Sequence, residues 1–407
     1  MAKKNSTKPE EFKEIDKINE INSVSDISPN WNDISTNYNK KISELYNTHI
    51  LNNIITKIND INFSNLANLL PKSSFSSEDT AVKHLKEAYS GGNLVLILGA
   101  GVSFNYKIPT WDSLLQRLLI KTIEKESETA LLISKLFSKV FNPSPLVAGR
   151  YLQTYHDEND KKDKNRFERE VQKALYETYD ENAESKVVDE IIKLCLAPGN
   201  SPNIDSIITY NYDDIIERKL IEKNLDMPFQ SVYGQSIDTT KTDLKIFHVH
   251  GYLPKDEKVN DENRITLGEF VYHEQYTNIY SWNNIVQINK FRDKVCLFMG
   301  TSLSDPNIRR LLDIANSQKK QKKFHYIFKK KIDRKWLIER INLIFSQNPE
   351  IYDEKVKDKL LLNDTIDFLI KYNNRYEEKD SESLGVKTVW INEYDEDISK
   401  ILKKIRS

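Results

Sequence analysis

The segment from Gly91 to Trp111, GGNLVLILGAGVSFNYKIPTW, constrains the fold of this chain more than any other. Its unbroken apolar run, Leu94 to Leu98, has no polar alternation, which is typical of a strand covered on both faces in a parallel sheet. Glycines follow at once, and glycine permits tight turns and close approach of the backbone to a ligand. Because Leu114 to Ile120 continue at helical spacing, we expect a strand, a tight turn and a helix, with phosphate near the exposed amides. The third glycine of the dinucleotide fingerprint is absent, so a plain strand-to-helix turn is the alternative.

Three further apolar runs end in polar turns in the same way. They are Ile204 to Thr209 before Tyr210-Asn211-Tyr212-Asp213-Asp214, Leu244 to Val249 before His250-Gly251, and Val295 to Met299 before Gly300-Thr301-Ser302-Leu303-Ser304-Asp305-Pro306. In an open parallel sheet, ligand-contacting side chains gather at the carboxyl ends of the strands. The sequence therefore predicts an α/β fold, a Rossmann-like parallel sheet with helical insertions, whose turns share one crevice.

These turns, taken in order, resemble the motifs of the sirtuin-like family. The chain has Gly-Ala-Gly-Val-Ser followed by Ile108-Pro109, then Thr-x-Asn-Tyr-Asp, then His-Gly, then Gly-Thr-Ser-x-x-Asp-Pro. The resemblance covers residues 81–312 and a closing strand near 386–391. In particular, the motifs look like those of the bacterial branch whose members hydrolyse nicotinamide adenine dinucleotide (NAD+) in antiphage defence. This resemblance implies NAD+ as the substrate.

Two departures separate the chain from the sirtuin deacylases. A typical deacylase has a zinc module of four cysteines, whereas this chain has only Cys195 and Cys296, so we expect no zinc and no other metal. Where a deacylase has Gly-x-Pro-Asp-Phe-Arg, this chain has Lys-Ile-Pro-Thr-Trp-Asp from Lys107 to Asp112, without the arginine. We therefore favour cleavage of NAD+ to nicotinamide and ADP-ribose. The alternatives are an NAD-dependent protein deacylase or ADP-ribosyltransferase, and a non-catalytic sensor of NAD or ADP-ribose.

Asn211 and His250 are the candidate catalytic residues, since they match the family's asparagine and the histidine of its His-Gly motif. Nicotinamide carries positive charge and leaves readily, so the enzyme must chiefly orient the ribose and stabilise an oxocarbenium-like centre, which suits a neutral carboxamide. An imidazole near neutral pKa can take a proton from a ribose hydroxyl or from water. Asn211 could instead merely turn the chain, and His248, on the same face of an ideal strand, is the fallback for His250.

The remaining site residues are assigned to NAD+ contacts. The glycine turn offers backbone amides and the Ser103 hydroxyl to pyrophosphate. Asp213 resembles the acidic residue after the family's asparagine and would help to fix the nicotinamide pocket, with a turn cap as the alternative. Asp305 lies in the turn assigned to ribose or phosphate, with a helix cap before Pro306 as the alternative. The predicted NAD-binding residues are Gly99, Ala100, Gly101, Val102, Ser103, Asp213, Gly300, Thr301, Ser302 and Asp305.

Charge and hydropathy limit the other function classes. The 407 residues hold 60 basic and 61 acidic side chains, and this balance argues against a dedicated nucleic-acid binder. A lysine cluster between Lys319 and Lys331 is interpreted as a solvated face rather than a nucleic-acid contact. No segment approaches the ~20 apolar residues of a membrane span, and no apolar region behind the start suggests a signal peptide. We therefore expect a cytoplasmic protein without a membrane partner, whose two cysteines serve as core side chains.

The chain is expected to have two parts. Residues 1–78 form an N-terminal helical extension, of which roughly the first ten are disordered. Apolar residues between Tyr38 and Ile61 recur at three- and four-residue spacing, and the resulting helix face packs either on its own domain or on another subunit. Residues 79–407 form the sirtuin-like NAD-binding domain, with a helical insertion at about 112–200 and a C-terminal helical segment at about 332–383.

Regulation is expected to come from assembly. An unregulated NADase would poison its own host, so the site should be completed on demand, by a homo-oligomer or by a partner. The chain has no second nucleotide fingerprint such as the P-loop motif. By resemblance to stand-alone sirtuin-like effectors of this length, a HerA-type ATPase is the expected partner, and an Argonaute-type protein is the alternative.

Overall fold

The computed structural model describes residues 70–123, 144–159, 163–196, 204–223, 228–234, 243–319, 324–347 and 354–407. The chain divides into two compact units. One unit holds residues 1–65 and 335–366, and its described part comprises most of helix α14 (Arg334–Gln347), helix α15 (Glu354–Leu360) and the start of helix α16 (Asn363–Ser383). The other unit, residues 66–334 and 367–407, contains the sheet and the candidate site.

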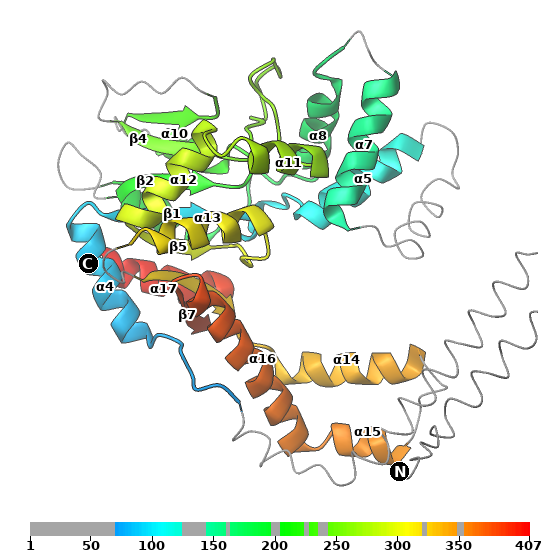
Figure 1. Ribbon diagram of the computed structural model, residues 1–407, viewed down its shortest axis with the longest axis vertical. Coiled ribbons are helices and arrows are strands. Elements are labelled where there is room, and N and C mark those ends of the chain that lie inside the picture. The colour runs from blue at the N-terminus through cyan, green and yellow to red at the C-terminus, as the bar shows by residue number, and fades with distance from the viewer. Residues whose placement is uncertain are drawn as a thin grey trace, which may run out of the picture. The chain divides into compact units, whose positions relative to one another are not determined.

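Seven strands of the second unit form one parallel sheet in the order β3-β4-β2-β1-β5-β6-β7 (Figure 1). The strands are β1 (Leu94–Leu98), β2 (Ile204–Thr209), β3 (Phe229–Val232), β4 (Leu244–His248), β5 (Val295–Met299), β6 (His325–Lys330) and β7 (Val386–Ile391). Helices flank the sheet. This architecture confirms the predicted α/β, Rossmann-like fold, and it places the glycine turn after the central strand.

The central strand is covered on both faces. Each of its five residues is at most 1% exposed. Leu94, Leu96 and Leu98 belong to one hydrophobic cluster, whereas Val95 and Ile97 belong to the other. Because successive side chains of a strand point to opposite faces, a strand buried on both faces needs an apolar residue at every position. The run without polar alternation is therefore the sequence signature of this strand.

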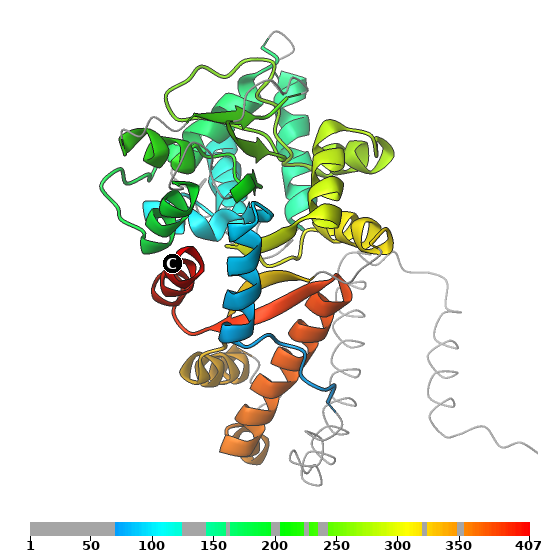
Figure 2. The same ribbon diagram turned by 90° about the vertical axis from the view of Figure 1, so that its left-hand side faces the viewer.

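Helices supply the apolar side chains on both faces. Their bounds are α4 (Glu78–Ser90), α5 (Trp111–Ile123), α7 (Pro145–Asn159), α8 (Arg166–Tyr176), α9 (Lys186–Cys195), α10 (Ile215–Glu222), α11 (Glu269–Thr277), α12 (Trp282–Asp293), α13 (Pro306–Ser317) and α17 (Tyr394–Arg406). Side chains of α4, α9, α10 and α17 join the cluster of Leu94, and Figure 2 shows α4 beside α17. Side chains of α12 and α13 join the cluster of Val95. Within the predicted insertion, α5, α7 and α8 pack on one another, whereas α9 packs on α17 and α10 as part of the sheet's own layers.

The elements differ from the sequence-based expectations at three places. β3 was not among the predicted strands, because this edge strand has only two apolar residues and three of its four residues are half-buried. The strand predicted to reach Val249 ends at His248. The C-terminal helical segment predicted at about 332–383 is divided among α14, α15 and α16.

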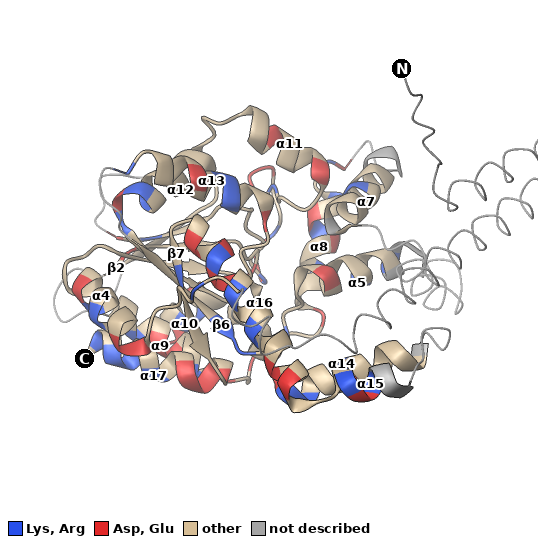
Figure 3. Ribbon diagram, turned by 60° about the horizontal axis from the view of Figure 1, so that its bottom comes forward, with Lys and Arg blue, Asp and Glu red and all other residues tan. Residues whose placement is uncertain are grey.

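Charges of both signs are mixed over the surface of the described helices (Figure 3). In the predicted lysine cluster, Lys329 forms an ion pair with Glu377, and Lys330 Nζ lies 3.4 Å from Glu393 Oε2. This part of the cluster is therefore balanced by acidic neighbours from α16 and from the residue before α17. The pairing agrees with its interpretation as a solvated face.

Three other predictions concern parts of the chain away from the site. Cys195 and Cys296 are both buried core side chains, and burial raises the pKa of each thiol. Among the residues that the structure describes, no helix is long and apolar enough to cross a membrane. The predicted amphipathic helix at Tyr38–Ile61 and the first ten residues lie outside the described residues.

Candidate active site

The turns after β1 and β5 are locked together through glycines. Gly99 N donates to Met299 O (2.9 Å) and Gly101 N donates to Gly300 O (3.0 Å). A Cβ atom on Gly99 would lie 2.6 Å from Gly300 O, and one on Gly101 would lie 2.8 Å from Gly300 Cα. Gly300 itself has φ +68°, a conformation that favours glycine. The glycines are thus required for the close approach of two turns to each other.

Four amides of the glycine turn donate hydrogen bonds to carbonyl oxygens of the protein. Besides the Gly99 and Gly101 amides, Val102 N donates to Gly99 O (3.0 Å) and Ser103 N donates to Ala100 O (3.2 Å) in a short 3₁₀ helix. Gly99 and Ala100 line the cavity described below, whereas Gly101, Val102 and Ser103 do not. In this conformation Gly99 and Ala100 form part of the wall of the site, and the contact of the turn with pyrophosphate stays a prediction.

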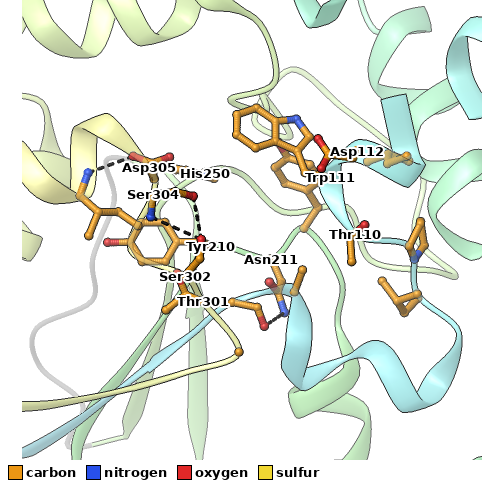
Figure 4. Close-up of a pocket in the computed structure, with 18 of the residues that line it drawn as sticks. Thr110, Trp111, Asp112, Tyr210, Asn211, His250, Thr301, Ser302, Ser304 and Asp305 are labelled. Carbon is orange, nitrogen blue, oxygen red and sulfur yellow. Dashed lines mark hydrogen bonds and ion pairs between the residues drawn. The ribbon is translucent and has the colours of Figure 1, made fainter. Parts of the chain in front are cut away.

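A cavity of about 520 Å³ lies at the carboxyl ends of β1, β2 and β5 and extends to the turn after β4. Apolar side chains from α5, α7 and α8, including Leu114, Leu146 and Leu175, form one part of its wall. The polar part brings together most of the predicted site residues. Figure 4 shows the arrangement of Asn211, His250, Thr301, Ser302 and Asp305 together with Thr110, Trp111, Asp112, Tyr210 and Ser304.

The carboxamide of Asn211 is held in one orientation. Its Nδ2 atom donates to Gly99 O (3.2 Å) and to Ser103 Oγ (3.1 Å). A carbonyl oxygen can only accept, so the atom that faces Gly99 O must be the nitrogen. Both amide protons are used in this way, and Oδ1 keeps its capacity to accept a hydrogen bond from water or a ribose hydroxyl.

Ser103 and Asp213 support Asn211 from behind the cavity wall. Ser103 is 1% exposed, and its hydroxyl donates to Asp213 Oδ1 (3.0 Å) while it accepts from Asn211 Nδ2. The same Asp213 oxygen accepts from Ile215 N (3.2 Å). Burial raises the pKa of Asp213 to about 6, although these two hydrogen bonds oppose the rise. Ser103 therefore orients Asn211, and its contact with pyrophosphate stays a prediction. Asp213 has the turn-capping role and also lines the cavity.

His250 presents a buried imidazole with one unused nitrogen. The residue is 7% exposed, and within the described part of the chain Nε2 has no hydrogen-bond partner. Asp305 Oδ2 lies 4.0 Å from this nitrogen, and the Tyr210 ring contacts the imidazole edge to face at 4.8 Å. Burial lowers the pKa of His250, and the negative charge of Asp305 opposes this effect. A neutral imidazole near pH 7 can accept a proton.

His248 has a different place from His250. β4 ends at His248, the chain turns with Gly251 N donating to His248 O (3.2 Å), and the two rings therefore leave the common face of an ideal strand. His248 Nε2 lies 2.7 Å from Glu217 Oε1, and Nδ1 lies 3.3 Å from the carbonyl oxygen of Asn211. The ring does not line the 520 Å³ cavity. His248 thus supports the backbone of Asn211, and the geometry favours His250 as the proton acceptor.

The turn after β5 is organised by its own side chains. Asp305 Oδ1 accepts from Asn307 N (2.8 Å) and Ile308 N (2.9 Å), which makes Asp305 the N-cap of α13. Ser302 Oγ and Ser304 Oγ are 2.7 Å apart, and Thr301 Oγ1 accepts from Leu303 N (3.4 Å). The helix-cap alternative for Asp305 is therefore realised, and the second carboxylate oxygen, Oδ2, accepts from the Tyr272 hydroxyl and lies 4.0 Å from His250 Nε2.

Sequence reasoning missed two aromatic residues of this region. Trp111 lines the cavity at the start of α5, and Tyr272 of α11 stacks on it with ring centroids 6.1 Å apart and an interplanar angle of 12°. The position of Trp111 two residues after Ile108-Pro109 is a signal that could have indicated the tryptophan. No sequence motif marks Tyr272, because only tertiary packing brings α11 next to the site. Among the described residues, no group of three or more His, Cys, Asp or Glu side chains could hold a metal ion.

Comparisons with known proteins find sequence similarity to SIR2-like proteins over part of the chain. A family model described as "SIR2-like domain" matches residues 205–346, which include Asn211, His250 and Asp305. The chain is also 23% identical over 328 residues to a protein named "NAD(+) hydrolase ThsA" from Enterococcus faecium. That alignment covers 80% of this chain and 57% of ThsA, so the chain spans little more than half the length of this relative. These similarities support the resemblance that the motifs indicate.

Proposed function

We propose that this chain is an NAD+ glycohydrolase that cleaves NAD+ to nicotinamide and ADP-ribose. The observation that carries the proposal is that the fixed Asn211 carboxamide and the His250 imidazole, whose Nε2 has no hydrogen-bond partner among the described residues, both belong to residues that line one cavity of about 520 Å³. The match to a SIR2-like domain and the similarity to an NAD(+) hydrolase support it.

The reaction requires little acid catalysis and much electrostatic stabilisation. When the C1′–N bond breaks, its electron pair passes to the nicotinamide nitrogen, which loses its positive charge, and positive charge develops at the ribose. The Asn211 Oδ1 dipole and the Asp305 carboxylate provide negative potential in the cavity for that centre. Water forms the new bond to C1′ and gives its proton to His250 Nε2. The site residues therefore orient the ribose, stabilise its charge and accept one proton.

Product analysis tests this function against the alternatives. Purified full-length chain is incubated with NAD+, with and without an acetylated peptide, and nicotinamide, ADP-ribose and O-acetyl-ADP-ribose are resolved by chromatography. Nicotinamide and free ADP-ribose without a peptide requirement support the glycohydrolase. Peptide-dependent turnover would indicate a deacylase, and NAD+ binding without cleavage in every assembly state would indicate a sensor.

We propose further that the enzyme is a cytoplasmic antiphage effector whose activity is gated by assembly. The motif resemblance to stand-alone effectors supports a homo-oligomer with a HerA-type ATPase as partner, or an Argonaute-type protein as the alternative. Co-purification followed by mass photometry, with NAD+ turnover measured with and without the partner, tests this proposal. Full turnover by the isolated chain at cellular NAD+ concentration would contradict partner gating.

We also propose that the N-terminal extension contributes to the oligomer and that the NAD-binding domain follows it. A deletion that tests this should stop before the segment that is anchored to the sheet. Ser76 N donates to Thr388 O of β7 (2.8 Å), and Ser73 Oγ donates to Glu378 Oε2 (2.8 Å). Removal of residues 1–69 keeps these contacts, and light scattering then measures the mass. An unchanged oligomer would exclude the deleted residues from the interface.

A further inference from the structure

Helix α11 places Tyr272 next to His250, the candidate proton acceptor. Tyr272 is 1% exposed, and its hydroxyl donates a hydrogen bond to Asp305 Oδ2. The other carboxylate oxygen, Oδ1, is already held by two backbone amides at the start of α13. The carboxylate of Asp305 is therefore fixed at both oxygens, by the helix cap on one side and by Tyr272 on the other.

This double attachment sets the position of Asp305 relative to His250. The oxygen that accepts from Tyr272 is the oxygen that lies 4.0 Å from His250 Nε2. At 4.0 Å the two atoms are too far apart for a direct hydrogen bond, yet close enough for a strong charge interaction in a buried site. Without the Tyr272 hydroxyl, this oxygen would have no described side-chain partner to hold it at that distance.

The Tyr272 ring also contacts the imidazole and the cavity wall. It meets the His250 ring at a centroid distance of 6.0 Å and an interplanar angle of 71°, and the Tyr210 ring contacts the same imidazole. Its other contact is the stacked ring of Trp111. The Tyr272 side chain thus contacts residues from three separate connections, which follow β1, β4 and β5.

The helix that carries Tyr272 is itself anchored to the site. Gln275, one turn further along α11, is 6% exposed, accepts from Asn307 Nδ2 (2.9 Å) and donates to Thr266 Oγ1 (2.9 Å). Asn284 Nδ2 donates to the carbonyl oxygen of Gln275 (2.9 Å). These bonds join α11 to α13 and to Thr266 in the segment between β4 and α11. They therefore hold Tyr272 in the position from which its hydroxyl reaches Asp305.

We propose that Tyr272 is a positioning residue for the hydrolysis: its hydroxyl holds the Asp305 carboxylate where it stabilises the imidazolium that forms when His250 takes the proton of the attacking water. The proposal rests on the proposed NAD+ glycohydrolase function. Tyr272 neither gains nor loses a proton in this step. Burial, followed by the charge of Asp305, raises its pKa, so the hydroxyl remains a hydrogen-bond donor throughout the working pH range.

The groups that face His250 limit what can influence its titration. Asp305 from the turn after β5 is the charged group near Nε2, and the neutral phenols of Tyr210 and Tyr272 face the ring from the turn after β2 and from α11. If Tyr272 acts through Asp305, its hydroxyl should matter only while the carboxylate is present. If Tyr272 only fills space, its hydroxyl should matter equally with or without that carboxylate.

A double-mutant cycle separates these two roles. Tyr272→Phe keeps the ring and removes the hydroxyl, and Asp305→Asn removes the charge but keeps an amide oxygen that can cap α13. Tyr276→Phe is the matched control, since Tyr276 lies one turn along the same helix and is 36% exposed. The NAD+ turnover of the full chain is measured for wild type, both single variants, the double variant and the control, each in the assembly state that is active for wild type.

We expect Tyr272→Phe to lower kcat by roughly tenfold with KM changed by less than about twofold, since the interaction is formed with the imidazolium and not with the substrate. In the Asp305→Asn background the same change should have no further effect. Equal effects of Tyr272→Phe in both backgrounds, or an equal effect of Tyr276→Phe, would overturn the proposal.

A second readout is independent of activity. The chain has seven histidines, and the signal of His250 in a ¹³C-histidine-labelled sample is assigned by its loss in His250→Ala. Tyr272→Phe should shift the His250 titration midpoint in the wild-type background and leave it unchanged in the Asp305→Asn background. A shift of the same size in both backgrounds would contradict the proposal. If wild type releases no nicotinamide in any assembly state, the glycohydrolase proposal fails, whereas the titration cycle still decides whether Tyr272 positions Asp305.

Discussion

Replacing Asp213 with asparagine is expected to stabilise the folded protein at neutral and alkaline pH. The side chain is buried, and this burial raises its pKa from 3.8 to about 6 even though Ser103 and Ile215 donate hydrogen bonds to Oδ1. One pKa unit corresponds to about 1.4 kcal/mol of differential stability between the two protonation states. The rise from 3.8 to about 6 therefore corresponds to at most about 3 kcal/mol.

The sign of the effect follows from proton binding. The folded state binds the Asp213 proton more tightly than the unfolded state, so the favourable contribution is complete below pH 3.8 and is lost as the pH rises through about 6. Asparagine stays neutral at every pH, and its Oδ1 atom can accept the same hydrogen bonds from Ser103 and Ile215. Relative to wild type, Asp213→Asn should gain about 1–3 kcal/mol of unfolding free energy at pH 8 and little at pH 4.

Chemical denaturation at pH 4, 6 and 8 measures this difference. Asp214→Asn is the matched control, because the neighbouring carboxylate pairs with Arg218 (2.9 Å) and accepts from Tyr176 (2.9 Å), so its neutralisation should destabilise the protein. The denaturation midpoints of wild type and Asp213→Asn should diverge as the pH rises. Parallel pH profiles, or a loss of stability in Asp213→Asn at pH 8, would refute the reasoning.

Two further predictions concern backbone and side-chain contacts that hold the domain together. Gly300→Ala should lower the unfolding free energy by about 3 kcal/mol or more, because φ is +68° and the new Cβ would lie 2.6 Å from Val102 N. Gly92→Ala, with φ +62° and open space around the new Cβ, should cost only about 1 kcal/mol in the same thermal melts, and equal costs would contradict the interlocked turns. Glu378 is 3% exposed and accepts from Trp390 Nε1, Ser73 Oγ, Ser74 N and Arg375 Nη1. Burial alone would raise its pKa, but these hydrogen bonds hold it below the usual value, so the stability they give is present at neutral pH and lost as the pH falls through the lowered pKa. Glu378→Gln should therefore cost about 1–3 kcal/mol at pH 7 and expose residues 70–77 to limited proteolysis, whereas unchanged proteolysis would show that the carboxylate does not hold this segment.

The sheet was predictable because its strands are covered on both faces. Buried strands such as β1 and β5 leave continuous apolar runs, and the polar turns after them mark the edge where the site forms. β3 escaped detection, since an edge strand with half-buried residues needs no such run. The order of the strands and the pairing of β1 with β2 and β5 arise from contacts between distant segments, which periodicity does not record.

Individual site residues could be predicted only where they belong to a sequence motif. Asn211 and His250 follow buried strands and line the cavity, as the motifs indicate. The bond of the Ser103 hydroxyl to Asn211 was not predicted, because it depends on how the glycine turn packs on the turn of Gly300 and on the turn after β2. Tyr272 was not predicted, since its bond to Asp305 joins residues 33 positions apart through the packing of α11 on α13.

Release of nicotinamide by wild type, Asn211→Ala and His250→Ala, measured beside NAD+ binding, tests the central claim most directly. Both residues lie in polar turns at strand ends, so truncation should leave folding and assembly close to normal. We expect wild type in its active assembly to release nicotinamide, and each variant to lose this activity while it keeps the wild-type unfolding transition and mass. Cleavage of NAD+ by Asn211→Ala and His250→Ala at the wild-type rate would contradict the assignment of the reaction to this cavity.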